Sequence, residues 1–149
     1  MARYKNALRG HFIAPVTDPK VEPEKSVYLE LAKWIEDIAD DTDEATTSVA
    51  YYDGDGTEET TVTSVKGSYT FKGTYDKEDP AMKHIADLKY KLGNERLVWH
   101  KIVDADGKNQ AVGIATVSDI KAGSGAAAEY EEFSCKISYN SLPKISAVV

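Results

Sequence analysis

The sequence has little of several residue types, and each scarcity excludes a class of protein. The single cysteine, Cys135, has no partner for an intramolecular disulfide and fits a reducing compartment. No apolar run is long enough for a signal peptide or a transmembrane helix, so we expect no membrane association. Positive charge is also scarce, because 18 Lys and Arg face 25 Asp and Glu and leave a net charge of −7. Binding of nucleic acid along a basic face is therefore not expected.

Motifs that carry catalysis or bind cofactors are missing as well. The three histidines, His11, His84 and His100, fall on different predicted elements without metal-ligand spacing, and we interpret them as surface or half-buried residues. There is no nucleophile elbow, no P-loop and no dinucleotide fingerprint. We therefore expect a protein that is not an enzyme, with no catalytic residues, no cofactor and no metal.

What the sequence does contain is a series of strand-like segments. A length of 149 residues is typical of one domain with its own hydrophobic core. Apolar content or alternation predicts strands at 7–16, 67–76, 95–104, 110–120 and 126–140. In the last of these, Phe133, Cys135 and Ile137 share the inward face, which makes Cys135 a buried structural thiol.

Residues 27–38, "VYLELAKWIEDI", are ambiguous from their pattern alone. Tyr28, Leu31 and Ile35 fit a helical period, while alternation of apolar residues fits less cleanly. The pattern leaves both a helix and a strand open for this segment.

One helix is clearly predicted at about 80–92. Asp79 is suited to the N-cap, Pro80 to the first helical position and Gly93 to the position after the end. Its apolar stripe consists of Ala81, Ile85, Leu88 and Leu92. The predicted fold class is therefore mainly β, a sandwich or barrel of two packed antiparallel sheets with one flanking α-helix.

An acidic segment stands out between the second and third predicted elements. Ten of the 25 acids lie between residues 36 and 59, and no Lys or Arg occurs between Lys33 and Lys66. Within it, "YYDGDGTEETT" at 51–61 matches the EF-hand pattern in neither of two registers, one that fits the required glycine and one that fits the first acid, because both fail at other positions. Asp53, Asp55 and Glu58 still leave an irregular calcium site open. The segment is either a solvated loop or a negative functional surface. The candidate binding residues are Asp40, Asp41, Asp43, Glu44, Asp53, Asp55, Glu58 and Glu59.

The order of these features resembles a known family over roughly residues 27–145. The matching stretches are "LAKWIEDIADDTDE", then the acidic loop, strand and helix up to "DPAMKHI", then closing strands that include "GIATVSDIKAGSGAAAEYEEFSCKIS". Together they resemble the tail tube proteins (major tail proteins) of long-tailed, non-contractile bacteriophages, which are similar to the tube proteins of contractile tails and type VI secretion.

The resemblance implies a structural virion protein, synthesised in the bacterial host cytoplasm, that forms hexameric rings stacked into a hollow tail tube. DNA would pass through a negatively charged lumen during ejection without specific binding. Partners would be further copies of the chain, tail tip and terminator proteins, and a tape measure protein inside the tube. Residues 1–149 would form one tail-tube domain, in which 27–38 is a strand, 39–62 an acidic inter-ring loop, and 141–149 a C-terminal arm. The eight candidate acids would then face the next ring or the lumen.

Three other functions stay open at this stage. One is the tube of a tail-like bacteriocin or a secretion system. Another is a small ligand- or calcium-binding β-sandwich module. The third is an enzyme that uses acids from 36–59, which the unbroken hydrophilic run disfavours because it offers no environment that separates two carboxyl pKa values.

Overall fold

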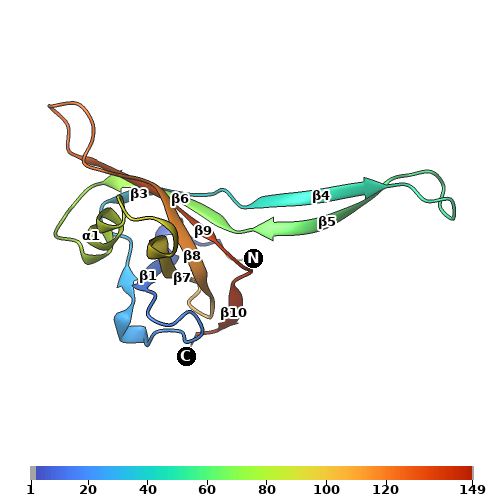
Figure 1. Ribbon diagram of the computed structural model, residues 1–149, viewed down its shortest axis with the longest axis horizontal. Coiled ribbons are helices and arrows are strands. Elements are labelled where there is room, and N and C mark those ends of the chain that lie inside the picture. Colours follow the sequence, from blue (N-terminus) through green and yellow to red (C-terminus); the bar gives the residue numbers. More distant parts are fainter. Residues whose placement is uncertain (1–2, 149) are drawn as a thin grey trace.

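The computed structural model describes residues 3–148, which form a mainly β fold with one α-helix (Figure 1). The strands are β1 (Gly10–Pro15), β2 (Leu29–Glu30), β3 (Ile35–Asp40), β4 (Asp43–Val49), β5 (Glu59–Lys66), β6 (Ser68–Thr74), β7 (Leu97–Val103), β8 (Asn109–Ala122), β9 (Glu132–Tyr139) and β10 (Lys144–Ala147). The helix α1 is Pro80–Asp87, and short 3₁₀ helices occur at Asn6–Leu8, Lys25–Val27 and Gly93–Arg96. The predicted fold class is confirmed.

The strands form one large sheet and one small pair. The large antiparallel sheet has the order β2-β1-β7-β8-β9-β6-β3, with β10 also paired to β8. The small sheet consists of β4 and β5 alone, and it extends away from the large sheet as a long ribbon. We call β4, β5 and their connection the ribbon, and the rest of the fold the body.

The large sheet is curled because its two end strands are consecutive in the chain. Only residues 31–34 separate β2 from β3, and so short a connection spans at most roughly 17 Å. Trp34 makes the corner with a φ of 65°, and a Cβ at the facing Gly73 would clash with its carbonyl oxygen. The single strand expected over 27–38 is therefore wrong in part, since the segment forms two short strands at opposite ends of one sheet.

The C-terminal segment also belongs to this sheet. β10 pairs with the first residues of β8, in the register Lys144 to Val112 and Ala147 to Asn109. β9 pairs with the later part of β8, from Ala115 to Ala122, so β9 and β10 lie one after the other along the same edge. Within the segment expected to be a C-terminal arm, 141–149, residues 144–147 thus form a strand paired with β8 of the same chain.

The helix starts as the sequence predicts but ends earlier. The Asp79 carboxylate accepts a hydrogen bond from the Met82 amide at 3.3 Å, which is the expected N-cap. The helix then ends at Asp87 rather than near 92, and Leu92 is 82% exposed instead of buried. The cause is Arg96, whose guanidinium group donates to three main-chain carbonyls, those of Lys89, Lys91 and Val117. These bonds take up carbonyls just past the helix and fix the chain there.

The core lies inside the curl of the large sheet, closed by the apolar face of α1. Its largest fully buried side chains include Phe71 and Phe133 from the sheet and Met82 and Ile85 from the helix. Cys135 is 1% exposed, and burial raises the pKa of its thiol to about 12. The predicted structural role of this cysteine is confirmed.

Candidate assembly surface

The ribbon is a regular antiparallel pair with no core of its own. The register runs from Asp43 opposite Lys66 to Val49 opposite Glu59, with one bulge that leaves Thr63 without a partner. The Thr63 hydroxyl instead donates to the Ala45 carbonyl at 3.0 Å. Every residue from 40 to 66 is exposed, so the segment expected as a loop over 39–62 is for the most part a solvent-exposed hairpin.

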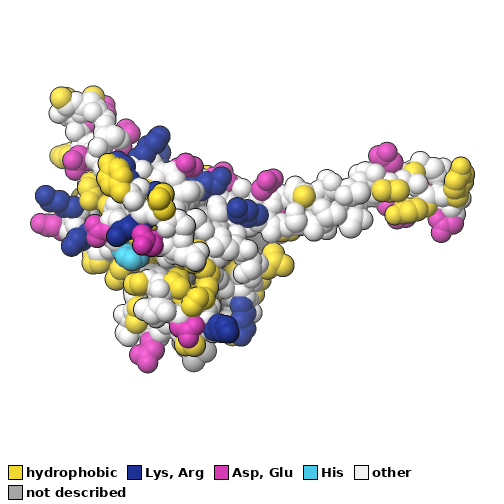
Figure 2. All heavy atoms as spheres, viewed as in Figure 1, with side chains coloured by type: hydrophobic (Ala, Val, Ile, Leu, Met, Phe, Trp, Pro, Cys, Tyr) yellow, Lys and Arg dark blue, Asp and Glu magenta, His cyan; other side chains and the backbone are white. Residues whose placement is uncertain are grey.

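The eight predicted site residues do not form one continuous acidic surface. At the root of the ribbon lie Asp40, Asp41, Asp43 and Glu44, and at its far end lie Asp53, Asp55, Glu58 and Glu59. Between the two groups, residues 45–50 and 60–65 are uncharged and rich in Thr, Ser and Val. Figure 2 shows this pattern as a pale shaft with acidic side chains gathered toward its two ends. The ribbon therefore presents three chemically different zones to solvent.

Two of the four acids at the root, Asp40 and Asp41, are hydrogen-bonded to their surroundings. Thr42 donates to the Asp40 carboxylate through its hydroxyl and through its amide, at 2.9 Å for the amide. These bonds, the hydroxyl first, lower the pKa of the Asp40 carboxyl. Asp41 accepts from the Thr70 hydroxyl, and its amide donates to the Ser68 carbonyl at 2.8 Å. The root is thus anchored on β6, and the direction in which the ribbon leaves the body is fixed.

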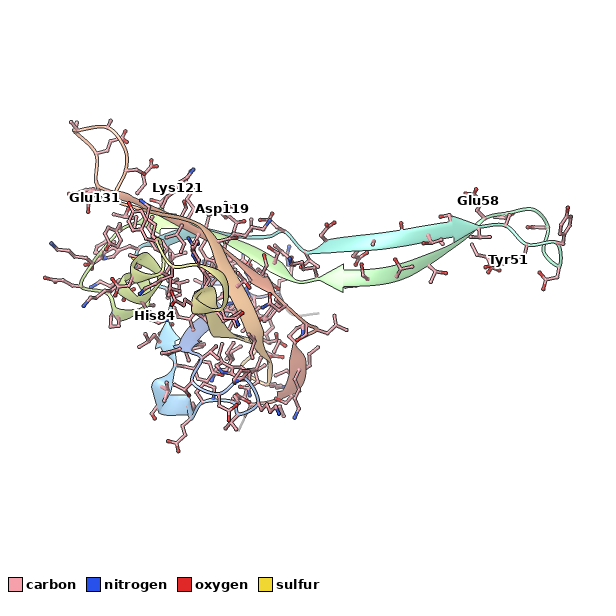
Figure 3. All side chains as sticks on the ribbon, viewed as in Figure 1. Tyr51, Glu58, His84, Asp119, Lys121 and Glu131 are labelled. Carbon is pink, nitrogen blue, oxygen red and sulfur yellow. The ribbon has the colours of Figure 1, made fainter. Side chains whose placement is uncertain are left out.

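The far end of the ribbon combines acids with aromatic side chains. The Gly54 amide donates to the Tyr51 carbonyl at 3.1 Å, and Gly56 has a φ of 90°, so the chain reverses there. Tyr51 is 58% exposed and Tyr52 is fully exposed. Figure 3 shows Tyr51 and Glu58 at this end, far from the residues that it labels on the body. We call residues 51–58 the ribbon tip.

The tip does not assemble the irregular calcium site left open by the sequence. Within residues 3–148, no group of three or more His, Cys, Asp and Glu side chains is placed to hold a metal ion. The Asp55 carboxylate accepts from the Thr57 amide at 2.9 Å, and this bond lowers the pKa of Asp55. This hydrogen bond stabilises the turn at the ribbon tip, as aspartate side chains in turns commonly do.

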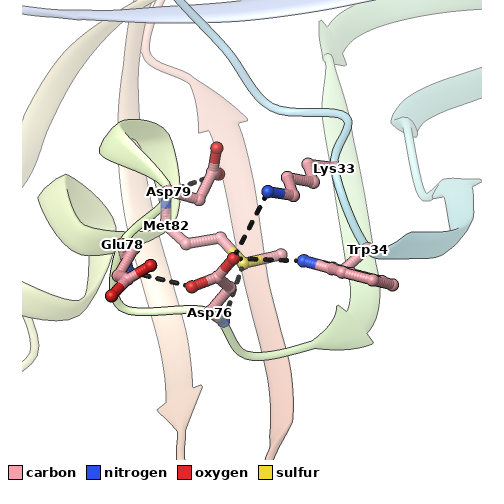
Figure 4. Close-up of polar contacts among 6 residues, drawn as sticks. All are labelled: Lys33, Trp34, Asp76, Glu78, Asp79 and Met82. Carbon is pink, nitrogen blue, oxygen red and sulfur yellow. Dashed lines mark hydrogen bonds and ion pairs between the residues drawn. The ribbon is translucent and has the colours of Figure 1, made fainter.

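A second polar cluster holds the corner from which β3 leads into the ribbon (Figure 4). The Trp34 indole donates to the Asp76 carboxylate at 3.1 Å, and the Lys33 ammonium lies 3.7 Å from the same carboxylate. The Glu78 amide also donates to Asp76, and it is the leading cause of the lowered pKa of that carboxyl. The Asp76 amide in turn donates to the Met82 sulfur at 3.4 Å. This cluster ties the corner to the start of α1.

Two histidines lie in the core, contrary to the interpretation from sequence. His11 and His100 are 2% and 0% exposed, and their ring nitrogens, Nδ1 and Nε2, are 3.4 Å apart. Since Arg9 donates to the other nitrogen of His11, that ring carries its proton on Nδ1 and donates to His100. Burial lowers the pKa of His11 to about 4 and that of His100 to about 3. A signal was available, because His100 lies within "LVWHKIV", a run that is apolar on both faces.

Comparisons with known proteins agree on the fold. No family model matches the chain, and no curated protein matches it. A chain from the tail of an empty GTA particle, refined helically with C6 symmetry, is similar with a TM-score of 0.71 and 10% identity, over 99% of this chain and 100% of that one. A chain from the virion of a native gene transfer agent (GTA) particle is similar with a TM-score of 0.65 and 10% identity, over 93% and 95%. The resemblance to tail tube proteins is therefore confirmed as one of fold, and it extends over nearly the whole chain.

Proposed function

We propose that this chain is the tube subunit of a phage-type tail, a structural protein of the virion with no enzymatic role. In this proposal six copies form a ring, rings stack into a hollow tube, and DNA passes through the lumen during ejection. Tail tip and terminator proteins would bind the ends of the tube, and a tape measure protein would lie inside it. The C6 symmetry reported for the similar GTA tail supports the number six.

The observation that carries the proposal is the ribbon. A two-stranded ribbon is marginally stable alone in water, and here 27 consecutive residues, 40–66, are all exposed. Contact with further copies would bury its Val and Tyr side chains and stabilise it. We therefore assign the ribbon, including its two acidic zones, to the contact between rings.

Charge supports the second half of the proposal. The net charge of −7 disfavours phosphate binding, which is what a conduit for DNA needs. Within residues 3–148, no helix is long and apolar enough to cross a membrane.

The experiment is negative-stain electron microscopy of the purified protein at high concentration, together with a shortened ribbon. The variant removes residues 47–61 and joins Thr46 to Val62, which face each other in the register, through an Asn-Gly turn. We expect tubes or six-fold rings for the wild type, and single rings or monomers with unchanged unfolding for the variant.

A matched control is Tyr130→Ser in the exposed 123–131 loop, which should leave tubes intact. Tubes of normal length from the shortened ribbon would refute its role between rings. Strict monomers for the wild type, with a melting temperature that rises on adding calcium, would instead favour the ligand-binding module.

A further inference from the structure

The ribbon tip has the composition of a group that docks into a partner. Tyr52 is fully exposed, its neighbour Tyr51 is 58% exposed, and Asp53 and, two residues further, Asp55 follow in the chain. Tyrosines that anchor in a pocket dominate the binding energy of many interfaces. A surface that binds the ribbon tip would therefore need an apolar cavity and a cation side by side.

The body contains a pocket of that kind, with a volume of about 520 Å³. It lies among β1, β7, the start of β8 and the segment 22–30, and its walls include Leu8, Phe12 and Val103. No residue of the ribbon lines it. The ribbon extends away from the body, so the tip of the same chain is not the group that fills this pocket.

Lys101 places a positive charge in the pocket. The residue is 7% exposed, and its ammonium group lies 4.5 Å from the ring centroid of Tyr28 and 5.2 Å from that of Phe12. Within residues 3–148, no carboxylate lies within 4.0 Å of this ammonium group. Burial and the nearby Lys25 disfavour this charge and lower the pKa of Lys101, and the attraction of Glu22 opposes them only in part. A carboxylate that a partner brings close to the ammonium group would favour the charge further.

Two glutamates at the rim of the pocket further restrict which segments can bind there. Glu22 and Glu30 also line the pocket, and Glu22 accepts a hydrogen bond from the Tyr28 hydroxyl at 3.4 Å. A purely acidic segment would be repelled by these two carboxylates. A segment that pairs a carboxylate with a phenol hydroxyl suits the pocket, because the hydroxyl donates to a rim glutamate while the carboxylate meets Lys101.

We infer that this pocket receives the ribbon tip of a second copy of the chain, with a tip tyrosine against Phe12 and Tyr28 and an adjacent aspartate beside Lys101. The inference rests on the proposed function and adds the acceptor surface for the ribbon. It makes the contact between rings a contact of one ribbon tip with one pocket, repeated around the ring.

Disulfide trapping tests the contact directly, because the only native cysteine, Cys135, is 1% exposed and so is not accessible for linkage. The test variant combines Gly54→Cys in the ribbon tip, which keeps both tyrosines, with Lys25→Cys at the pocket rim. The control variant combines Gly54→Cys with Tyr90→Cys, an 88% exposed position outside the pocket. After mild oxidation of protein at tube-forming concentration, we expect at least tenfold more linked multimers on a non-reducing gel for the test variant than for the control.

The outcomes separate this inference from the proposed function. Tubes without preferential linkage through the Lys25 position would overturn the pocket while leaving the tube subunit in place. Linked dimers without tubes would support the pocket and overturn the tube. Neither tubes nor linkage would overturn both.

A second measurement covers the case in which the engineered cysteines disturb docking. Lys101→Met removes the charge but keeps the length of the side chain, and Lys83→Met on the exposed face of α1 is its control. We expect the concentration needed for tube formation to rise at least tenfold for Lys101→Met alone, with both variants melting like the wild type. Equal assembly of the two variants would overturn the role of Lys101.

Discussion

The body and the ribbon are built on opposite principles within one chain. The body closes a curled sheet with a helix and buries aromatic and aliphatic side chains completely, so it carries its own stability. The ribbon pairs strands with good register but buries nothing, because all its side chains face water. Apolar burial thus stabilises one part of this molecule, whereas the other part has no such burial within the chain and, in the proposed function, would gain it from contact with further copies.

A carboxylate introduced into the body should lower the free energy of unfolding far more than a carboxylate introduced into the ribbon. Ile85→Asp places a carboxylate at a site that is 0% exposed, and we expect it to lower the free energy of unfolding by about 3–5 kcal/mol. Val62→Asp introduces the same group on the ribbon, at 50% exposure, and should change it by less than about 0.5 kcal/mol. Urea unfolding of both variants measures the contrast, and equal losses would contradict the division.

Acid should destabilise the body through its buried histidines. The pKa values of His11 and His100 lie at about 4 and about 3 in the folded chain, below the ordinary 6.5. The unfolded chain therefore binds more protons in this range, and stability is lost as pH falls from about 6.5 toward 4. We expect a loss of a few kcal/mol over that range, measured by urea unfolding at successive pH values.

The control for this prediction is His11→Leu, which removes one titrating group and should flatten the pH dependence. Asp40, whose carboxyl pKa is lowered from 3.8, contributes to the loss chiefly below that range, so it does not mask the histidines. A profile that is flat between pH 6.5 and 4 for the wild type would show that the pair is not buried in solution.

Glycines should also differ between the two regions. A Cβ at Gly73 meets the Trp34 carbonyl, so Gly73→Ala forces the backbone corner apart and should cost roughly 1–3 kcal/mol. At Gly54 in the ribbon tip the nearest atom to a Cβ is 3.5 Å away, and Gly54→Ala should leave stability nearly unchanged. Thermal melting of the pair measures the effect. A neutral Gly73→Ala would mean that the corner is looser than the structure indicates.

The sequence predicts the body better than the ribbon for a physical reason. Buried strands such as β7 and β9 reveal themselves because one or both faces must be apolar, and the cap at Asp79 is a local interaction. The ribbon faces water on both sides, so its Thr- and Ser-rich strands carry no alternation and resemble a loop.

Long-range contacts explain what else sequence reasoning missed. The early end of α1 depends on Arg96, and the corner at Trp34 depends on the absence of a side chain at Gly73. The pocket around Lys101 is equally invisible, because its walls come from separate parts of the chain, residues 8–12, 22–30 and 101–110 with residue 148. Of the candidate site, composition identified the eight acids but not their division into a root group and a tip group.

The pairing of β1 with β7 has a consequence for how the subunit is made. His11 lies opposite Ile102, so β1 can pair with the short β2 early but cannot join β7 until the chain has grown about 90 residues further. Closing so large a loop is slow, and we expect β7, β8 and β9 to pair first and β1 to join late. The ribbon is a local hairpin and does not wait for that step. The ribbon can thus form before the body is closed, so in the proposed function the pace of sheet closure would determine when a new subunit is ready to join a tube.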